Sequence, residues 1–176
     1  MRKLGLVLPV AALFAFGCGG DDDDDAGAID AAGGGAIDAA ADTTYTVTLT
    51  NANEVGSTCT AAPPAAATGT AMVTINAAGT QVAVTLSWSG LSGAATAAHI
   101  HANVAGMNGG VALAFAAAGT APTSPVTKTF TTADFTAPMG GPADFAALIT
   151  AMKAGGTYVN VHTANCPMGE IRGQIE

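Results

Sequence analysis

The chain has 176 residues, with 13 Asp and Glu against five Lys and Arg, which gives a net charge of -8 at neutral pH. This length suits one folded domain with appended segments and leaves no comfortable room for two domains. From Thr43 onward only Lys128, Lys153 and Arg172 are basic. So few basic side chains release few counterions from a phosphate backbone, which excludes a nucleic-acid-binding domain.

The chain begins with two basic residues and an apolar run, Leu4 to Phe16. The run is shorter than the roughly 20 residues that span a bilayer, and its organisation is typical of a secretory signal. It ends on a small residue before Cys18, which resembles the lipobox of bacterial lipoproteins. We therefore expect residues 1–17 to be a lipoprotein signal peptide and Cys18 to carry lipid. The alternative is ordinary cleavage, with Cys18 as an incidental thiol.

Residues 19–42 contain eight Asp and no basic residue, and the unit Gly-Ala-Ile-Asp-Ala-Ala occurs twice in them. Such a segment buries too little apolar surface to offset its ordering entropy. We predict that residues 18–42 are the lipidated Cys and a flexible acidic linker. Because Gly19 stands where inner-membrane lipoproteins of well-studied bacteria carry Asp, we expect an outer-membrane or cell-surface location.

From Tyr45 onward apolar residues alternate with polar ones, a pattern that predicts half-buried strands. Strands of this length and spacing indicate an all-β domain over residues 43–176, an antiparallel Greek-key-like β-sandwich or barrel. One stretch, 142–154, has apolar residues at helical spacing and predicts a short helix over one opening of the sheet. The predicted strands lie at 45–49, 71–75, 82–88, 98–100, 111–115, 158–162 and 170–175.

If Cys18 carries lipid, Cys59 and Cys166 remain as an even pair in an oxidising compartment, which predicts a disulfide. The alternative is a free Cys166 thiol that binds a metal. His162, Cys166 and Met168 contain the ligand types of a blue-copper site, but a disulfide at Cys166 would remove the thiolate.

Four stretches of the sequence are similar to the CHRD domain over about residues 43–176. This domain is named after chordin, a secreted animal antagonist of bone morphogenetic proteins, and it also occurs in bacterial envelope and secreted proteins. The resemblance implies an extracellular all-β domain. It does not imply growth-factor binding, because a lipobox protein is bacterial. The four stretches are Asn53-Glu54-Val55, Leu91-Ser92-Gly93, Ala97 to His101, and Tyr158 to Asn165 continuing into Gly169 to Ile175.

The sequence departs from the CHRD pattern at two places. The Pro pair that usually follows Asn-Glu-Val is delayed to Pro63-Pro64 by an insertion that carries Cys59, and Cys166 stands where the family does not usually have Cys. Both departures involve the cysteines expected to pair, which supports the disulfide.

The sequence contains three histidines, His99, His101 and His162. Residues two apart on a strand project from one face roughly 7 Å apart, so His99 and His101 project together. A His-x-His pair with a third His from another strand is a recurrent way to hold zinc or copper. The alternative is a structural role, in which the imidazoles form hydrogen bonds to loop carbonyls or polar neighbours.

No motif of an esterase, metalloprotease, dithiol redox protein or nucleotide-binding protein is present in the sequence. We expect Glu170 and Arg172, which share one strand face, to form an ion pair with a neighbour. Together these features predict a non-enzymatic, lipid-anchored cell-envelope or surface module with a binding or structural role, and a surface protein as its partner. The alternative is a mononuclear copper- or zinc-binding protein that uses His99, His101 and His162.

Overall fold

The computed structural model describes residues 40–176, which contain eight strands, one α-helix and two short 3-10 helices. The predicted signal peptide, Cys18 and most of the acidic linker lie outside the described residues. All predicted strands are present, and an additional strand, β6, was not predicted. The strands are β1 (Thr43–Thr50), β2 (Thr68–Ile75), β3 (Val82–Ser89), β4 (Ala95–Ala102), β5 (Gly110–Ala114), β6 (Val126–Phe130), β7 (Thr157–Thr163) and β8 (Ile171–Gln174).

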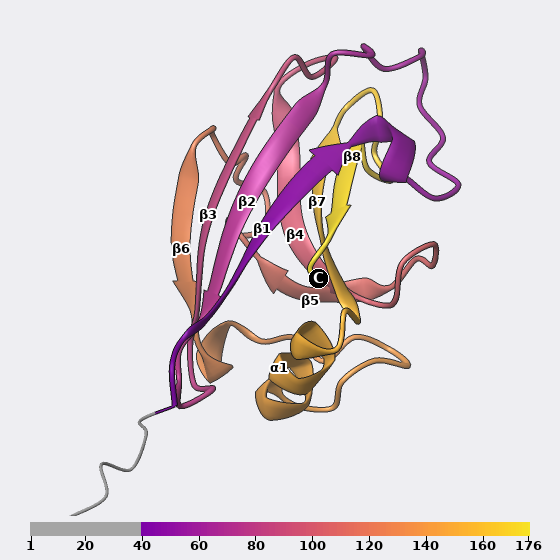
Figure 1. Ribbon diagram of the computed structural model, residues 1–176. Helices are drawn as coiled ribbons and strands as arrows, with labels where there is room; N and C mark the ends of the chain where they lie inside the picture. The colour runs from indigo at the N-terminus through magenta and orange to yellow at the C-terminus, as the bar shows by residue number, and fades with distance from the viewer. Residues whose placement is uncertain (1–39) are drawn as a thin grey trace, which may run out of the picture. The chain divides into compact units, whose positions relative to one another are not determined.

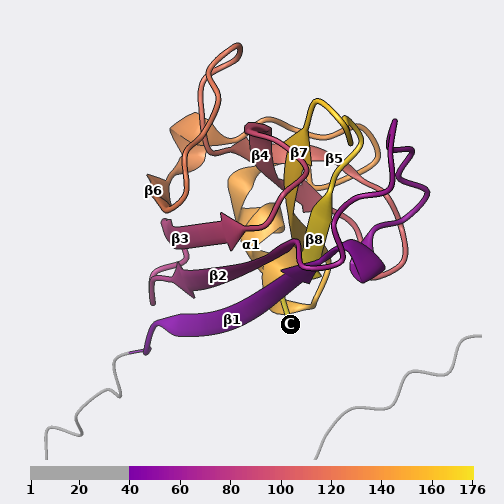
Figure 2. The same cartoon turned by 90° about the horizontal axis from the view of Figure 1, so that it is seen from above.

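The strands form one antiparallel sheet in the order β5-β4-β7-β8-β1-β2-β3-β6. β1, β2 and β3 are neighbours both in the chain and in the sheet. The pairs β3–β6, β4–β7 and β8–β1 are neighbours in the sheet but not consecutive in the chain. The sheet curls strongly, so that β5 and β6 approach each other (Figures 1 and 2). Of the two predicted architectures, the nearly closed barrel is the one that the chain adopts.

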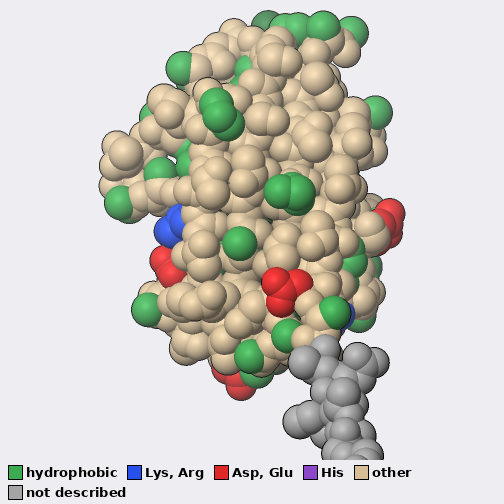
Figure 3. Space-filling view, turned by 60° about the vertical axis from the view of Figure 1, so that its left-hand side comes forward, with side chains coloured by type: hydrophobic (Ala, Val, Ile, Leu, Met, Phe, Trp, Pro, Cys, Tyr) green, Lys and Arg blue, Asp and Glu red, His purple; other side chains and the backbone are tan. Residues whose placement is uncertain are grey.

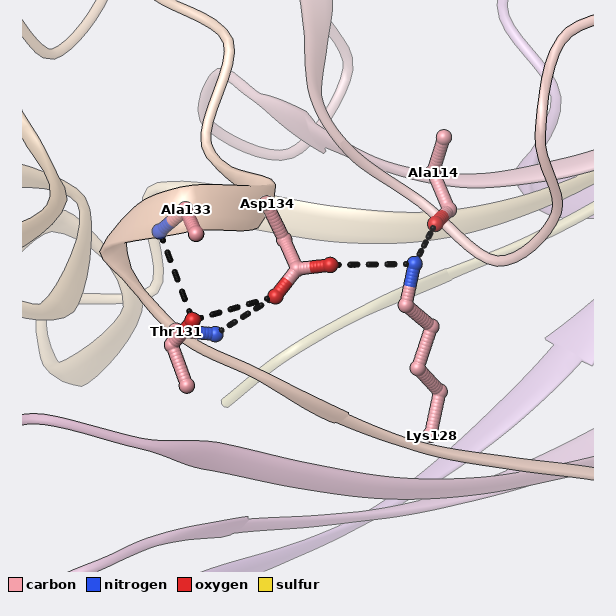
Figure 4. A network of polar contacts seen from close by, with 5 residues as sticks. All are labelled: Ala114, Lys128, Thr131, Ala133 and Asp134. Atoms are coloured by element: carbon pink, nitrogen blue, oxygen red, sulfur yellow. Dashed lines mark hydrogen bonds and ion pairs between the residues drawn. The ribbon is translucent and has the colours of Figure 1, made fainter.

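Lys128 on β6 bridges the two ends of the sheet (Figure 4). Its Nζ donates a hydrogen bond to the carbonyl of Ala114 on β5 at 2.9 Å and lies 3.3 Å from the carboxylate of Asp134. The rings of Phe115 and Phe130 pack edge to face beneath this bridge, with centroids 5.2 Å apart. The bridge thus links the two edge strands through side chains, while β5 and β6 remain the terminal strands of the sheet.

The barrel core is filled by the inward-facing side chains of all eight strands, mostly Val, Leu, Ile and Ala. Helix α1 (Phe145–Lys153) lies across one end of the barrel, as Figure 1 shows, and buries Phe145, Leu148, Ile149 and Met152. The Asp144 carboxylate caps its first turn by accepting a hydrogen bond from the Ala147 N–H at 2.8 Å. The predicted helix is therefore confirmed, with shorter ends. Within residues 40–176 no helix is long and apolar enough to cross a membrane.

The predicted disulfide is confirmed, because Cys59 and Cys166 are bonded to each other across a sequence separation of 107 residues. The bond joins the long loop between β1 and β2 to the turn between β7 and β8. Cys166 is therefore not a free thiol, and the alternative in which it binds a metal is wrong.

Candidate metal centre

The outer face of β4, β7 and β8 is buried, although the sequence pattern alone would leave it exposed. Every residue of β7 is buried, whereas residues of β2 alternate between exposed and buried over most of its length. The side chains on this outer face are polar. Loops 51–67, 103–109 and 164–170 pack over them, as hydrogen bonds from these loops to β7 and β8 show. The barrel therefore has a second, polar buried layer outside its apolar core.

The sheet register brings the three histidines together. β4 pairs with β7 so that His99 lies opposite Asn160, His101 lies opposite Tyr158, and Ala97 lies opposite His162. On β7, His162 and Asn160 are two residues apart and share a face. His162 is therefore a diagonal neighbour of His99, and the strand adjacency that a shared metal site requires is present.

The three imidazoles form a compact cluster. His99 Nδ1 and His162 Nε2 lie 3.2 Å apart, and one ring nitrogen from each of the three histidines lies within 4.8 Å of the others. Their ring centroids are separated by 5.0 Å for His99 and His162, 5.5 Å for His99 and His101, and 5.7 Å for His101 and His162.

Two backbone carbonyls fix the orientation of two of these rings. His101 Nδ1 donates to the carbonyl of Gly109 at 3.0 Å, and His162 Nδ1 donates to the carbonyl of Pro167 at 3.1 Å. With the proton on Nδ1, each neutral ring presents its Nε2 lone pair to the cluster. His101 Nε2 is buried and has no hydrogen-bond partner among the described residues. The predicted structural hydrogen bonds are thus present. His162 Nε2 accepts a hydrogen bond from His99 Nδ1 in the metal-free protein, so a metal ion would replace that hydrogen bond.

Burial keeps the imidazoles neutral. Loss of hydration, together with repulsion from the other two histidines, lowers the pKa of His99 to about 4. Burial also lowers the pKa of His101 to about 4, against an opposing contribution from the hydrogen bond to Gly109. Burial lowers the pKa of His162 as well. All three rings are therefore in the deprotonated form that binds metal ions at neutral pH.

Arg172 on β8 holds the β4–β5 loop in place over the cluster. It is 2% exposed, and its guanidinium donates to Asn108 Oδ1 at 3.2 Å and to the carbonyl of Met107 at 2.8 Å. Its other side stacks on the Tyr158 ring, with Cζ 3.4 Å from the centroid, and Tyr158 stacks in turn on His101. This loop carries the Gly109 carbonyl, so Arg172 indirectly positions His101.

The expected ion pair of Glu170 and Arg172 with a neighbour is wrong for both residues. Within residues 40–176 neither takes part in a salt bridge. The Glu170 carboxylate accepts hydrogen bonds from the Ser92 N–H at 2.6 Å, from the Ser92 hydroxyl at 2.5 Å and from the Thr163 hydroxyl at 2.6 Å. These bonds tie the Leu91-Ser92-Gly93 turn to the end of β7, so Glu170 has a structural role.

Asn160 borders the cluster and Glu54 lies beside Asn160, and the sequence prediction did not include them as site residues. Burial raises the pKa of Glu54 to about 7, although the charge of Arg172 and the amide of Asn160 oppose this shift. Both residues belong to the stretches that resemble the CHRD domain. That shared membership was the one signal in the sequence that grouped them with the histidines.

The alternative blue-copper ligand set is not assembled. Cys166 is held in its disulfide, and Met168 is 61% exposed. Among residues 40–176, the three imidazoles are the His, Cys, Asp or Glu ligands that converge.

A comparison with protein-family models matches the CHRD domain over residues 45–175. Comparisons with curated proteins and with solved structures gave no match. The family match covers almost all of the described residues, from the first strand to the end of β8.

Proposed function

Because the chain belongs to the CHRD domain family, whose members are binding or structural modules, we propose that it is a non-enzymatic module of the bacterial cell envelope that binds one copper or zinc ion. The ligands are His99, His101 and His162. The observation that carries this proposal is the convergence of three ring nitrogens within 4.8 Å of one another.

The distances suit one shared ion. Zn–N bonds of about 2.0–2.1 Å in tetrahedral geometry place two ligand nitrogens about 3.4 Å apart. His99 Nδ1 and His162 Nε2 lie 3.2 Å apart, close to that spacing, and one nitrogen of His101 lies within 4.8 Å of both. In metal sites, the ring nitrogen of a ligating imidazole that does not bind the metal commonly donates its N–H to a backbone carbonyl. His101 and His162 both make such a hydrogen bond.

Copper and zinc are the ions that this donor set favours. Imidazole is a good ligand for both, whereas calcium and magnesium prefer oxygen. Three protein ligands also leave a fourth coordination position for a small exogenous ligand.

The envelope location is supported by the N-terminal sequence and by the disulfide. An apolar run that ends on Cys18 suits lipid attachment, and the Cys59–Cys166 bond suits an oxidising compartment. In this proposal the acidic linker separates the domain from an outer-membrane or cell-surface anchor, where a surface protein is its partner.

Metal content tests the proposed site. The full chain with Cys18→Ser is exported to an oxidising compartment, exposed to copper or zinc, dialysed, and measured by mass spectrometry. We expect about one equivalent of metal, as for a single mononuclear site, and loss of that metal in His99→Ala/His101→Ala. A Thr70→Ala/Thr85→Ala variant, changed on the opposite half of the sheet, is the control and should retain it. No retained metal in the unsubstituted chain contradicts the proposal.

Detergent phase separation tests the anchor. The unsubstituted protein should enter the detergent phase after expression in a bacterium that processes lipoproteins, and Cys18→Ser should move to the aqueous phase. Aqueous partitioning of both proteins contradicts lipidation.

A further inference from the structure

Two buried oxygen atoms beside the histidine cluster have no hydrogen-bond partner within residues 40–176. They are Asn160 Oδ1 and Glu54 Oε1. Asn160 is 3% exposed, so its Oδ1 does not exchange freely with bulk water. A buried acceptor without a donor costs free energy, and such atoms in a native protein indicate a ligand, an ion or an ordered water.

Asn160 occupies the position on β7 that borders all three histidines. It lies directly opposite His99, two residues from His162 on the same face, and diagonal to His101 across the β4–β7 pair. Directly opposite residues on neighbouring strands have Cβ atoms about 4.5–5.5 Å apart, and diagonal neighbours are within reach of long side chains. The Asn160 amide therefore forms part of the wall of the cluster.

Glu54 reaches the same place from the loop that follows β1. A Cβ atom at Gly169 would lie 2.5 Å from Asn160 Nδ2, 2.6 Å from Asn160 Oδ1 and 2.7 Å from Glu54 Oε1. These separations are too short for a real Cβ contact, so glycine at 169 allows the Asn160 amide and the Glu54 carboxyl to approach each other against the backbone. A side chain at this position would displace the two groups.

No donor side chain among the described residues satisfies these two oxygens. Arg172, the nearest cation in the network, directs its hydrogen bonds to Asn108 and to the carbonyls of Val104 and Met107. The two unsatisfied atoms are both acceptors when the Glu54 carboxyl is ionised, and their complement is then a proton donor. A water molecule bound to a metal ion is a strong donor, because the ion lowers the pKa of that water.

We propose that Asn160 and Glu54 hold a water molecule at the fourth coordination position of the metal ion, and that this position selects a neutral, proton-donating ligand over an anion. This inference rests on the proposed metal site and adds to it the chemical class of the exogenous ligand that the metal ion accepts. An anion such as azide offers no proton to the two acceptors, and it meets the charge of the Glu54 carboxylate.

Azide binding to the copper(II)-loaded protein tests this selection. The full chain with Cys18→Ser is loaded with copper and titrated with azide at pH 8, and the azide-to-copper charge-transfer absorption reports binding. Glu54→Gln removes the charge and keeps the shape, so azide affinity should rise about tenfold, as for the loss of one nearby negative charge. Asn160→Ala removes the second acceptor and should also raise the azide affinity.

Glu176→Gln is the matched control, because it removes the same charge from an exposed position at the end of the chain. Its azide affinity should equal that of the unsubstituted protein. Copper content and thermal unfolding are measured for every variant, and the near-isosteric Glu54→Gln decides the test if Asn160→Ala does not fold. Retained copper with unchanged azide affinity in Glu54→Gln, or no azide binding to any variant, overturns this assignment alone. Loss of copper from the unsubstituted protein overturns the metal site as well.

Discussion

The two halves of the barrel differ in their outer faces. On β1, β2 and β3 the outward residues are mostly exposed Thr and Ser, and Figure 3, which brings the β6 side forward, shows a surface with few charged side chains. On β4, β7 and β8 the outward residues are His, Asn, Tyr, Arg and Gln, and most of them are buried beneath loops. We call β1, β2 and β3, together with β6 beside β3, the open half, and β4, β7 and β8 the covered half.

The difference between the two halves indicates that the candidate functional site lies on the covered half. The open half follows simple alternation, in which threonine suits an exposed strand face because of its β-branched side chain. The covered half must satisfy every polar group that it buries. It does so with loop carbonyls and side-chain networks. Within residues 40–176 five buried side-chain atoms lack a partner, and three of them, on Glu54, His101 and Asn160, lie in or beside the histidine cluster. A ligand bound there would satisfy them.

The largest expected effect compares one cation from each half. Arg172→Met removes a charged donor and leaves the loop carbonyls that it binds unpaired, so the unfolding free energy should fall by about 3 kcal/mol. Lys128→Met removes a partly exposed ion pair from the open half and should cost about 1 kcal/mol or less. Urea denaturation measures both. Equal costs would show that the covered half does not depend on its polar network.

A smaller effect compares two threonines. Thr163 is fully buried and donates to the Glu170 carboxylate, whereas Thr70 is exposed on the open half. Thr163→Val should cost about 2 kcal/mol, because a carboxylate loses one of its donors. Thr70→Val keeps the branched shape and should change stability by less than about 0.5 kcal/mol. Thermal unfolding of the two variants checks this, and a costly Thr70→Val would contradict the distinction between the halves.

The smallest effect is the pH dependence of the metal-free protein. The pKa values of His99 and His101 are about 4 in the fold, against 6.5 when unfolded. The contribution of these two neutral imidazoles to the free energy of unfolding is therefore complete above pH 6.5. It is lost as the pH falls toward 4, because over this range the unfolded chain binds protons that the folded chain does not. Between pH 7 and 4.5 the unsubstituted protein should lose at least about 1 kcal/mol more stability than His99→Gln/His101→Gln.

Glu54 titrates in the opposite sense, because its pKa is raised to about 7. It is present in both proteins of that comparison, so its contribution cancels in the difference. Parallel stability profiles for the two proteins, measured by urea denaturation at each pH, would contradict burial of neutral imidazoles.

The sequence predicted most of the open half and only part of the covered half. Alternation identified β1, β2 and β3, but β6 was missed because Lys128 occupies an inward position between Val126 and Phe130. The even number of remaining cysteines and the oxidising compartment predicted the disulfide. The three histidines were found by residue type and spacing, but their adjacency depends on the pairing of β4 with β7, which residues far apart in the chain determine.

Three features of the site had no local sequence signal. The carbonyls of Gly109 and Pro167 carry no side-chain information, and they fix the rings of His101 and His162 only after both loops fold. Glu54 is brought to Asn160 by the loop after β1, and Gly169 leaves the space in which they meet. Such long-range contacts are set by the tertiary structure rather than by a motif.

X-ray absorption spectroscopy of the metal-loaded protein tests the central claim most directly, because it reports the atoms bound to the ion. We predict a first shell of nitrogen and oxygen at about 2.0–2.1 Å, with the outer-shell scattering of three imidazoles and no sulfur. A sulfur ligand, or fewer than two imidazoles, would contradict a site built from His99, His101 and His162.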